Sequence, residues 1–158
     1  TAYEIVDCDW SSDVCSSDLR DRSCGTCHAC CDGHLSGEAY GHKFWQGRKC
    51  FFVNESGCTI YGNHPISPCK NYKCVWLEDK SIPEWMRPDL SKVILTRETI
   101  NGIPYVSIKE AGQKIDSSIL NWIFTQYAED KFENIRYQID GGWNWMGSQE
   151  FVNAVSKI

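Results

Sequence analysis

The stretch that decides the fold reads Cys24-Gly-Thr-Cys27-His-Ala-Cys30-Cys31. Its spacing, C-x2-C-x2-C-C, repeats the two-residue interval at which two thiolates reach the same metal ion. Residues 20–76 around it are rich in glycine and poor in hydrophobic periodicity, so they need a cross-link to hold their shape. Metal or disulfide can supply that link. Four more cysteines follow, and none occurs after them: Cys50, Cys58, Cys69 and Cys74.

The composition bounds the classes of protein to which the chain can belong. Its 158 residues are 42% hydrophobic and 13% aromatic, with a net charge of -5, which is typical of one globular domain. Lys and Arg are scattered singly, so we expect no nucleic-acid partner. No apolar run approaches the roughly 20 residues that span a membrane. No secretory signal is recognisable, so we expect no membrane partner and a cytoplasmic protein.

Residues 11–19 differ in character from the rest of the chain. They read SSDVCSSDL and resemble the translation of a sequencing adaptor joined into an assembly. We therefore expect residues 1–19 to be a non-native or disordered leader, and we discount Cys8 and Cys15 as ligands. Residues 20–158 then form one metal-chelating domain, in which the cysteine cluster occupies 24–77 and an α+β remainder occupies 78–158.

Two hairpins are predicted. In the cysteine region, the β-prone runs 49–53 and 58–61 flank a turn over 54–57. In the second half, the runs 92–99 and 103–109 flank Asn101-Gly102, a dipeptide typical of a two-residue hairpin turn.

An amphipathic helix is predicted over 116–130, with Asp116 or Ser117 as its N-cap. A strand over 134–139 that ends at Gly141-Gly142 and a terminal helix over 148–158 follow. We predict an α+β fold, in which a loop-rich cysteine region packs beside a small antiparallel sheet with two or three helices.

Disulfides and haem are two alternatives for the cysteines. Eight cysteines can pair in 105 ways, but a protein without an export signal keeps its thiols reduced, and adjacent Cys30 and Cys31 cannot bridge each other without strain. A c-type haem fits Cys24-Gly-Thr-Cys27-His28, which matches C-x-x-C-H. It would require export and would leave Cys30 and Cys31 without a role.

Zinc and an iron–sulfur cluster are the other two alternatives for the cysteines. Zinc needs four thiolates, yet the second group, spaced C-x7-C-x10-C-x4-C, holds no second knuckle. An iron–sulfur cluster accepts thiolates from separated loops, and C-x2-C-x2-C matches the first three ligands of bacterial ferredoxins, although their C-x3-C-P ending is absent. The spacing favours the cluster over zinc. The candidate ligands exceed the four that one centre needs, which implies two sites or additional structural or redox roles: Cys24, Cys27, Cys30, Cys31, Cys50, Cys58, Cys69 and Cys74.

A few other side chains are candidates for roles around the centre. His28 and His34 flank the cysteines and are either loop histidines or ligands. Tyr72 and Trp76 lie between or beside ligands, so we expect them in an apolar shell that excludes water. The remaining tryptophans are interpreted as packing residues.

The order of the motifs resembles a bacterial cysteine-cluster family. After C-x-x-C-x-x-C-C come Cys50-Phe-Phe, Cys58-Thr-Ile-Tyr, Pro65 and Cys69-Lys-Asn-Tyr-Lys-Cys74-Val-Trp76. This order is similar to the CxxCxxCC (YkgJ-like) family, which is described as a zinc- or iron-chelating domain, and the resemblance covers residues 24–77. The chain departs from the family at His64-Pro65, where the family has Arg-Pro. The departure removes a fixed cation and adds an imidazole that can bind metal.

The resemblance implies a metal-binding protein with redox or group-transfer chemistry and an unidentified redox or protein partner. One branch of the family resembles flagellin lysine methylases, whose cysteine cluster is assigned an iron–sulfur centre for methyl transfer. The chain shows no glycine-rich S-adenosylmethionine signature, so an enzymatic role rests on analogy alone. The alternative function is a zinc-stabilised structural or interaction module without catalysis.

Overall fold

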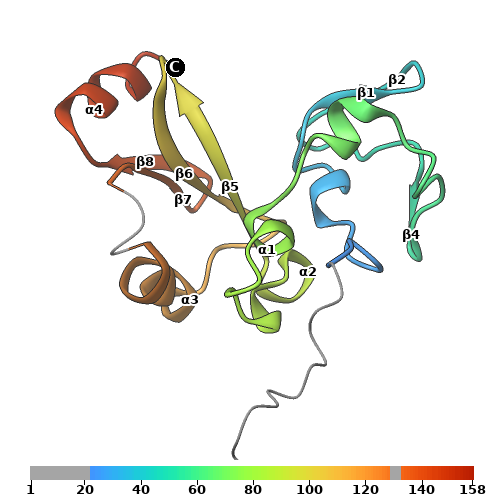
Figure 1. Ribbon diagram of the computed structural model, residues 1–158, viewed down its shortest axis with the longest axis horizontal. Coiled ribbons are helices and arrows are strands. Elements are labelled where there is room, and N and C mark those ends of the chain that lie inside the picture. The colour runs from blue at the N-terminus through green and yellow to red at the C-terminus, as the bar shows by residue number, and fades with distance from the viewer. Residues whose placement is uncertain (1–21, 129–132) are drawn as a thin grey trace, which may run out of the picture.

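The chain has an α+β fold, as predicted, in which a cysteine lobe and a four-stranded sheet lie on opposite sides of two short helices (Figure 1). The computed structural model describes residues 22–128 and 133–158, so the leader predicted at 1–19 lies outside the described residues. The sheet has the strand order β5-β6-β7-β8, with bounds Val93–Ile100, Ile103–Glu110, Ile135–Ile139 and Gly142–Met146. In the described residues, no helix is both long and apolar enough to cross a membrane.

The hairpin of β5 and β6 is confirmed. Asn101 and Gly102 have φ values of 51° and 81°, and the antiparallel register pairs Ile100 with Ile103 directly across them. A positive φ at both central residues gives a turn whose twist matches that of the strands, which is why this dipeptide predicts the hairpin. Each strand begins or ends within one residue of the predicted bounds.

The predicted strand over 134–139 is β7, but the chain does not leave the sheet at Gly141-Gly142. Asp140 and Gly141 adopt φ values of 52° and 77° and form a second hairpin turn. Gly142 then begins β8, which pairs antiparallel with β7 and was not predicted. β7 itself pairs with β6 in parallel, because the chain crosses over through α3 between these two strands.

Both predicted helices form. α3 (Ser117–Trp122) continues as the wider helical turn η4 (Ile123–Ala128), and its predicted end at 130 lies outside the described residues. The Asp116 carboxylate caps α3 by accepting from the Ser118 N–H at 2.8 Å. α4 (Gln149–Val155) is shorter than predicted and is capped by the Ser148 hydroxyl. Its buried Phe151 packs against Tyr105 of β6, with ring centroids 5.2 Å apart.

The cysteine lobe, residues 24–74, contains only short elements. Its predicted hairpin is formed by β3 (Val53–Asn54) and β4 (Gly57–Cys58). A further hairpin, not predicted, pairs β1 (Gly37–Ala39) with β2 (His42–Phe44). Two helical turns, η1 (Ala29–Cys31) and η2 (Ile66–Lys70), carry cysteines.

Three short helices join the lobe to the sheet: α1 (Val75–Glu78), η3 (Glu84–Met86) and α2 (Pro88–Ser91). Val75, Ile82 and Met86 are buried against β5 and β6, in the main core of the protein. The helix that follows the last cysteine is therefore anchored in the core of the sheet.

Candidate metal centre

A cavity of about 140 Å³ lies in the cysteine lobe, and all eight candidate ligands line it. Each of them is a free thiol. The rest of the lining is mostly aromatic, aliphatic or imidazole, with Ser36 and Gly25 beside them, and no described Asp, Glu, Lys or Arg takes part in it. The cavity therefore gathers thiols from the whole length of the lobe in a lining without charged side chains.

The first motif forms a pair of tight turns. The Cys27 N–H donates to the Cys24 carbonyl at 2.7 Å, and the Cys31 N–H donates to the His28 carbonyl at 2.9 Å. Gly25, with φ at 52°, takes the left-handed conformation inside the first turn. These turns fold the four cysteines of the motif back toward one side of the lobe.

Backbone contacts bring the later cysteines to this motif. The Cys50 N–H donates to the Cys31 carbonyl at 2.8 Å. The Cys24 N–H donates to the Tyr61 hydroxyl at 3.3 Å, which holds the segment after Cys58 against the start of the motif. The Gly57 backbone also packs closely on the motif, because a Cβ at this position would lie 3.2 Å from the Gly25 carbonyl oxygen.

A close approach between β1 and η2 places Cys69. A Cβ at Gly37 would lie 2.6 Å from Cγ of Pro68 and 2.9 Å from Cζ of Phe44. Only glycine lets these three groups pack at this distance. The loop before Cys69 is thereby held against the first hairpin of the lobe.

The cavity lies where two hydrophobic clusters meet. Cys30 and Cys74 pack in the main core, beside Val75 and Trp76. Three other cysteines pack in a smaller cluster that belongs to the lobe and is built on Ala39, Phe44 and Val53: Cys31, Cys50 and Cys69. The thiols thus bridge the lobe to the rest of the fold.

Burial dominates the acid–base properties of these thiols. It raises the pKa of Cys27 to about 11 and that of Cys31 to about 12. Neighbouring sulfurs add to the effect at Cys31, namely those of Cys50, Cys69, Cys58 and Cys24. Burial also raises the pKa values of Cys24 and Cys69. A thiol that would ionise here therefore needs a cation beside it.

Cys74 differs from the other thiols. A hydrogen bond with Cys30 lowers the pKa of Cys74, while the same contact raises the pKa of Cys30. The backbone N–H groups of Trp76 and Leu77, at the start of α1, also favour the Cys74 thiolate. The Tyr72 hydroxyl lies 3.7 Å from Sγ of Cys30 and is the donor in this contact, because the one S–H hydrogen of Cys30 faces Cys74.

Two residues of the lining hold buried nitrogen atoms without a hydrogen-bond partner. They are Nδ1 of His28 and Nε1 of Trp76, and in the described residues the only other such side-chain atom is Nε of Arg136. Most buried polar groups in proteins are paired. The cavity therefore has hydrogen-bonding capacity that its own thiols do not use.

The sulfurs share a cavity without forming a single coordination point. Within 22–128 and 133–158, no group of three or more His, Cys, Asp or Glu side chains is arranged to hold one metal ion. Rotation of the cysteine side chains about χ1 is therefore required before several thiolates can bind the same centre.

The histidines and aromatic residues divide between the cavity and its surroundings. His28, Tyr72 and Trp76 line the cavity. His34 does not: it lies beside Gly112, and its carbonyl accepts from Nζ of Lys109. Its interpretation as a ligand is thus not supported by its position, because the turn after Cys31 carries it toward β6.

His64 also lines the cavity. Its Nδ1 accepts from the Gly62 N–H at 3.0 Å, and its ring stacks on Tyr61. Because Nδ1 is used as an acceptor, the neutral ring carries its proton on Nε2. In this state Nε2 of His64 is a hydrogen-bond donor, so binding of a metal by this ring would require a change of its protonation or of the contact with Gly62.

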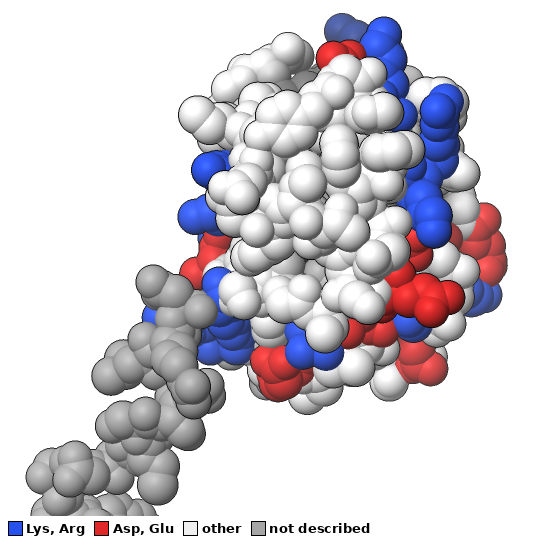
Figure 2. All heavy atoms as spheres, turned by 90° about the vertical axis from the view of Figure 1, so that its right-hand side faces the viewer, with Lys and Arg blue, Asp and Glu red and all other residues white. Residues whose placement is uncertain are grey.

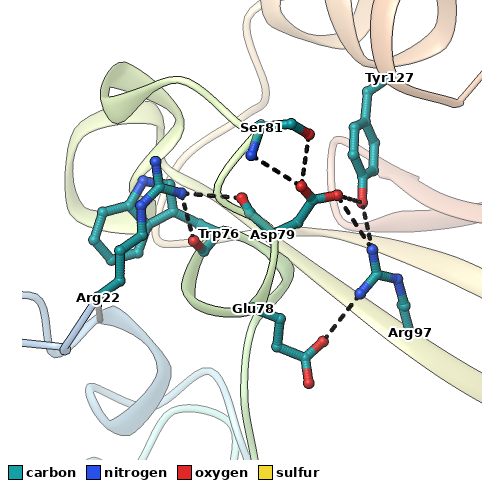
Figure 3. A network of polar contacts seen from close by, with 7 residues as sticks. All are labelled: Arg22, Trp76, Glu78, Asp79, Ser81, Arg97 and Tyr127. Atoms are coloured by element: carbon teal, nitrogen blue, oxygen red, sulfur yellow. Dashed lines mark hydrogen bonds and ion pairs between the residues drawn. The ribbon is translucent and has the colours of Figure 1, made fainter. Parts of the chain in front are cut away.

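Arg22 is a residue of the site that the sequence did not reveal. Its guanidinium stacks on Trp76, 4.7 Å from the ring centroid, and donates to the carbonyls of Trp76 and Asp79 at 2.7 and 3.1 Å (Figure 3). It also donates to the Ile82 carbonyl at 2.7 Å. No spacing rule signals such a contact, because its acceptors are backbone atoms 54 to 60 residues away.

One face of the lobe carries no charged side chain over its centre. Figure 2 shows this side of the molecule, where Lys, Arg, Asp and Glu lie at the margins. The lobe exposes five large apolar side chains to more than 45%: Tyr40, Trp45, Phe51, Tyr61 and Ile66. Tyr61 also lines the cavity, so the exposed apolar surface reaches the cysteines.

No protein-family model, curated protein or solved structure matches this chain. The likeness to the cysteine-cluster family therefore rests on the residues of the motifs.

Proposed function

We propose that this chain is a metal-binding protein of the cysteine-cluster type, in which the cavity holds an iron–sulfur cluster. The observation that carries the proposal is that all eight cysteines selected from the sequence line one cavity. They come from separate turns and hairpins of the lobe, as the ligands of a cluster commonly do. Cysteines spread evenly over a protein surface would not all line one cavity.

The residues present fit such a centre. Thiolates are the ligands of iron–sulfur clusters and of zinc, and eight free thiols are available. Most of the lining is apolar, and an apolar shell around a centre limits access of water and tunes the potential of a cluster. The unpartnered indole N–H of Trp76 supplies a hydrogen-bond donor of the kind that a sulfur-bound, negatively charged centre requires.

The eight cysteines would not all have equal roles. Cys74 is the thiol whose ionisation the structure favours most, so we expect it to bind first. Cys27 faces a different neighbour from the others, because the Asp89 carboxylate of α2 contacts its thiol. When bound, an iron–sulfur cluster supplies one-electron transfer.

The position of the cavity supports a redox or group-transfer role with a protein partner. Tyr61 is 49% exposed and also lines the cysteine cavity, and exposed apolar patches commonly mark interaction sites. We place the protein in the cytoplasm in this proposal, because its free thiols persist in a reducing compartment.

One observation favours the second candidate, a zinc-stabilised module. The fully buried core of the lobe consists of four residues, Ala39, Phe44, Cys50 and Val53. So small a core does not hold a segment of this length without a cross-link. Zinc would supply that link without any catalysis.

Anaerobic purification of the full chain separates the two candidates. Iron, zinc and acid-labile sulfide are quantified per chain, and the visible absorbance spectrum is recorded. Iron and sulfide in stoichiometric amounts with a brown colour support the cluster. A colourless protein with stoichiometric zinc supports the module instead. A folded protein that retains neither metal contradicts both.

A further inference from the structure

Trp76 occupies a distinctive position relative to the cysteines. It is two residues after Cys74, in the first turn of α1, and its side chain lines the cysteine cavity. The residue is 6% exposed, and its indole N–H is fully buried without an acceptor. An indole carries one donor and no acceptor, so this group can be satisfied only by an acceptor that is brought to it.

Two arginines hold the ring and the helix that carries it. The Arg22 guanidinium covers one face of the ring and binds carbonyls at the end of α1. Arg97 pairs with Glu78 and Asp79 at 3.3 Å each, which ties the end of α1 to β5 (Figure 3). The Asp79 carboxylate also accepts from the Ser81 hydroxyl at 2.6 Å. The helix is therefore fixed, and the indole has little freedom to find another acceptor.

The surroundings limit what the acceptor can be. No described carboxylate lines the cavity, and none of its thiols accepts from the indole N–H. A neutral thiol is a weak acceptor, whereas a metal-bound thiolate or an inorganic sulfide carries negative charge and accepts strongly. The cationic guanidinium on the ring face further favours donation by the N–H, since it withdraws electron density from the indole.

We propose that the indole N–H of Trp76 donates a hydrogen bond to an anionic sulfur of the centre that the cavity binds. The inference rests on the proposed function and assigns Trp76 as a positioning residue that stabilises the bound centre. Donors to cluster sulfurs raise the reduction potential, because they stabilise the more negative, reduced state. In zinc-bound protein the same bond strengthens metal retention.

The direct test follows the indole N–H signals of the full chain by nitrogen-15 NMR while zinc is added. We expect one indole signal to shift strongly on zinc binding, and this signal is absent in the Trp76→Phe variant. If zinc binds and no indole signal of Trp76 moves, the inference is overturned although the metal site stands. If zinc does not bind at all, the proposed function itself fails, so the two failures are distinguishable.

Metal retention gives a second measurement. Trp76→Phe keeps an aromatic ring and removes the donor. In competition with a chelator, we expect this variant to bind zinc about 10- to 100-fold more weakly than the wild type does. Trp122→Phe is the matched control, because Trp122 packs on Trp85, with ring centroids 4.9 Å apart, and does not line the cavity. In iron-loaded protein, Trp76→Phe lowers the reduction potential and Trp122→Phe does not. Equal retention and equal potential in both variants overturn the inference.

Discussion

The backbone N–H of Cys50 donates to the carbonyl of Cys31 at 2.8 Å, which joins the second group of cysteines to the end of the first motif. Residues 32–49 form a closed loop between these two positions, and the hairpin of β1 and β2 lies in it. The contact explains how irregular spacing in the sequence becomes one cavity in the fold. A loop of any length between Cys31 and Cys50 can serve, provided that its ends meet.

Cys31 is the thiol that we expect to matter most for metal retention, because four other cysteines act on its pKa: Cys50, Cys69, Cys58 and Cys24. Cys31→Ser should reduce metal affinity by at least about tenfold, the lower bound for partners that only support ligands. The measurement is metal content per chain after anaerobic purification and chelator competition. Cys15→Ser is the control and should retain wild-type content. Loss of metal in Cys15→Ser alone would contradict the choice of ligands.

Gly37→Ala should destabilise the lobe. The added Cβ would meet Cγ of Pro68 at 2.6 Å, so β1 and the segment before Cys69 have to separate. Overpacking of this kind costs about 1–3 kcal/mol in the free energy of unfolding. Chemical denaturation measures it, with the exposed Glu38→Ala on the same strand as control, for which we expect a change within about 0.5 kcal/mol. If Gly37→Ala were as stable as the wild type, the close contact of Gly37 with Pro68 would not contribute to stability.

Arg22→Ala should lower stability through α1. The guanidinium donates to the carbonyls of Trp76, Asp79 and Ile82, and hydrogen bonds to charged groups contribute about 1.5–3 kcal/mol. We expect a loss near the lower end, since Arg22 is partly exposed. Arg48→Ala is the control, because Arg48 also stacks on a tryptophan, Trp45, which is 46% exposed. A loss no larger than that of Arg48→Ala would contradict an anchoring role.

The raised pKa of Tyr105 leads us to expect a loss of stability at alkaline pH. Burial and a hydrogen bond at 2.6 Å to Glu98 raise the pKa of Tyr105 from 10.0 to about 12. The unfolded chain therefore releases this proton at lower pH than the folded protein does. The free energy of unfolding falls as pH rises from about 10 to about 12, and it is unaffected by Tyr105 below that window.

Denaturation curves at several pH values measure this dependence. Tyr105→Phe removes the Tyr105 contribution, so its slope against pH should be shallower than that of the wild type between these two values. Tyr40→Phe, at a position 61% exposed, should keep the wild-type slope. Identical slopes in all three proteins would contradict the assignment.

The sequence predicted the elements whose local chemistry is decisive. Asn101-Gly102 specifies a turn through its own backbone preference, and Asp116 caps α3 through a contact two residues away. β8 was missed because Gly141 was interpreted as the end of the sheet, whereas its positive φ serves a turn back into it. β1 and β2 are three residues long and too short for alternation to be visible.

In the candidate site, too, the sequence identified some residues and not others. The eight cysteines were identified by residue type and spacing, and they line one cavity. His34 and His28 could not be told apart by distance from the motif, since only the fold decides that His28 lines the cavity. Arg22 was invisible because its partners are backbone carbonyls far along the chain. Contacts of that kind depend on tertiary structure and leave no pattern in sequence.

X-ray absorption at the iron and zinc edges of anaerobically purified protein tests directly whether the cysteine cavity binds metal. We predict that the bound metal has sulfur in its first shell, at roughly 2.3 Å as in zinc thiolates, with iron–iron scattering when a cluster is present. Cys31→Ser should change this shell or lose the metal, and Cys15→Ser should leave it as in the wild type. A first shell of oxygen and nitrogen alone would contradict metal binding by the cysteine cavity.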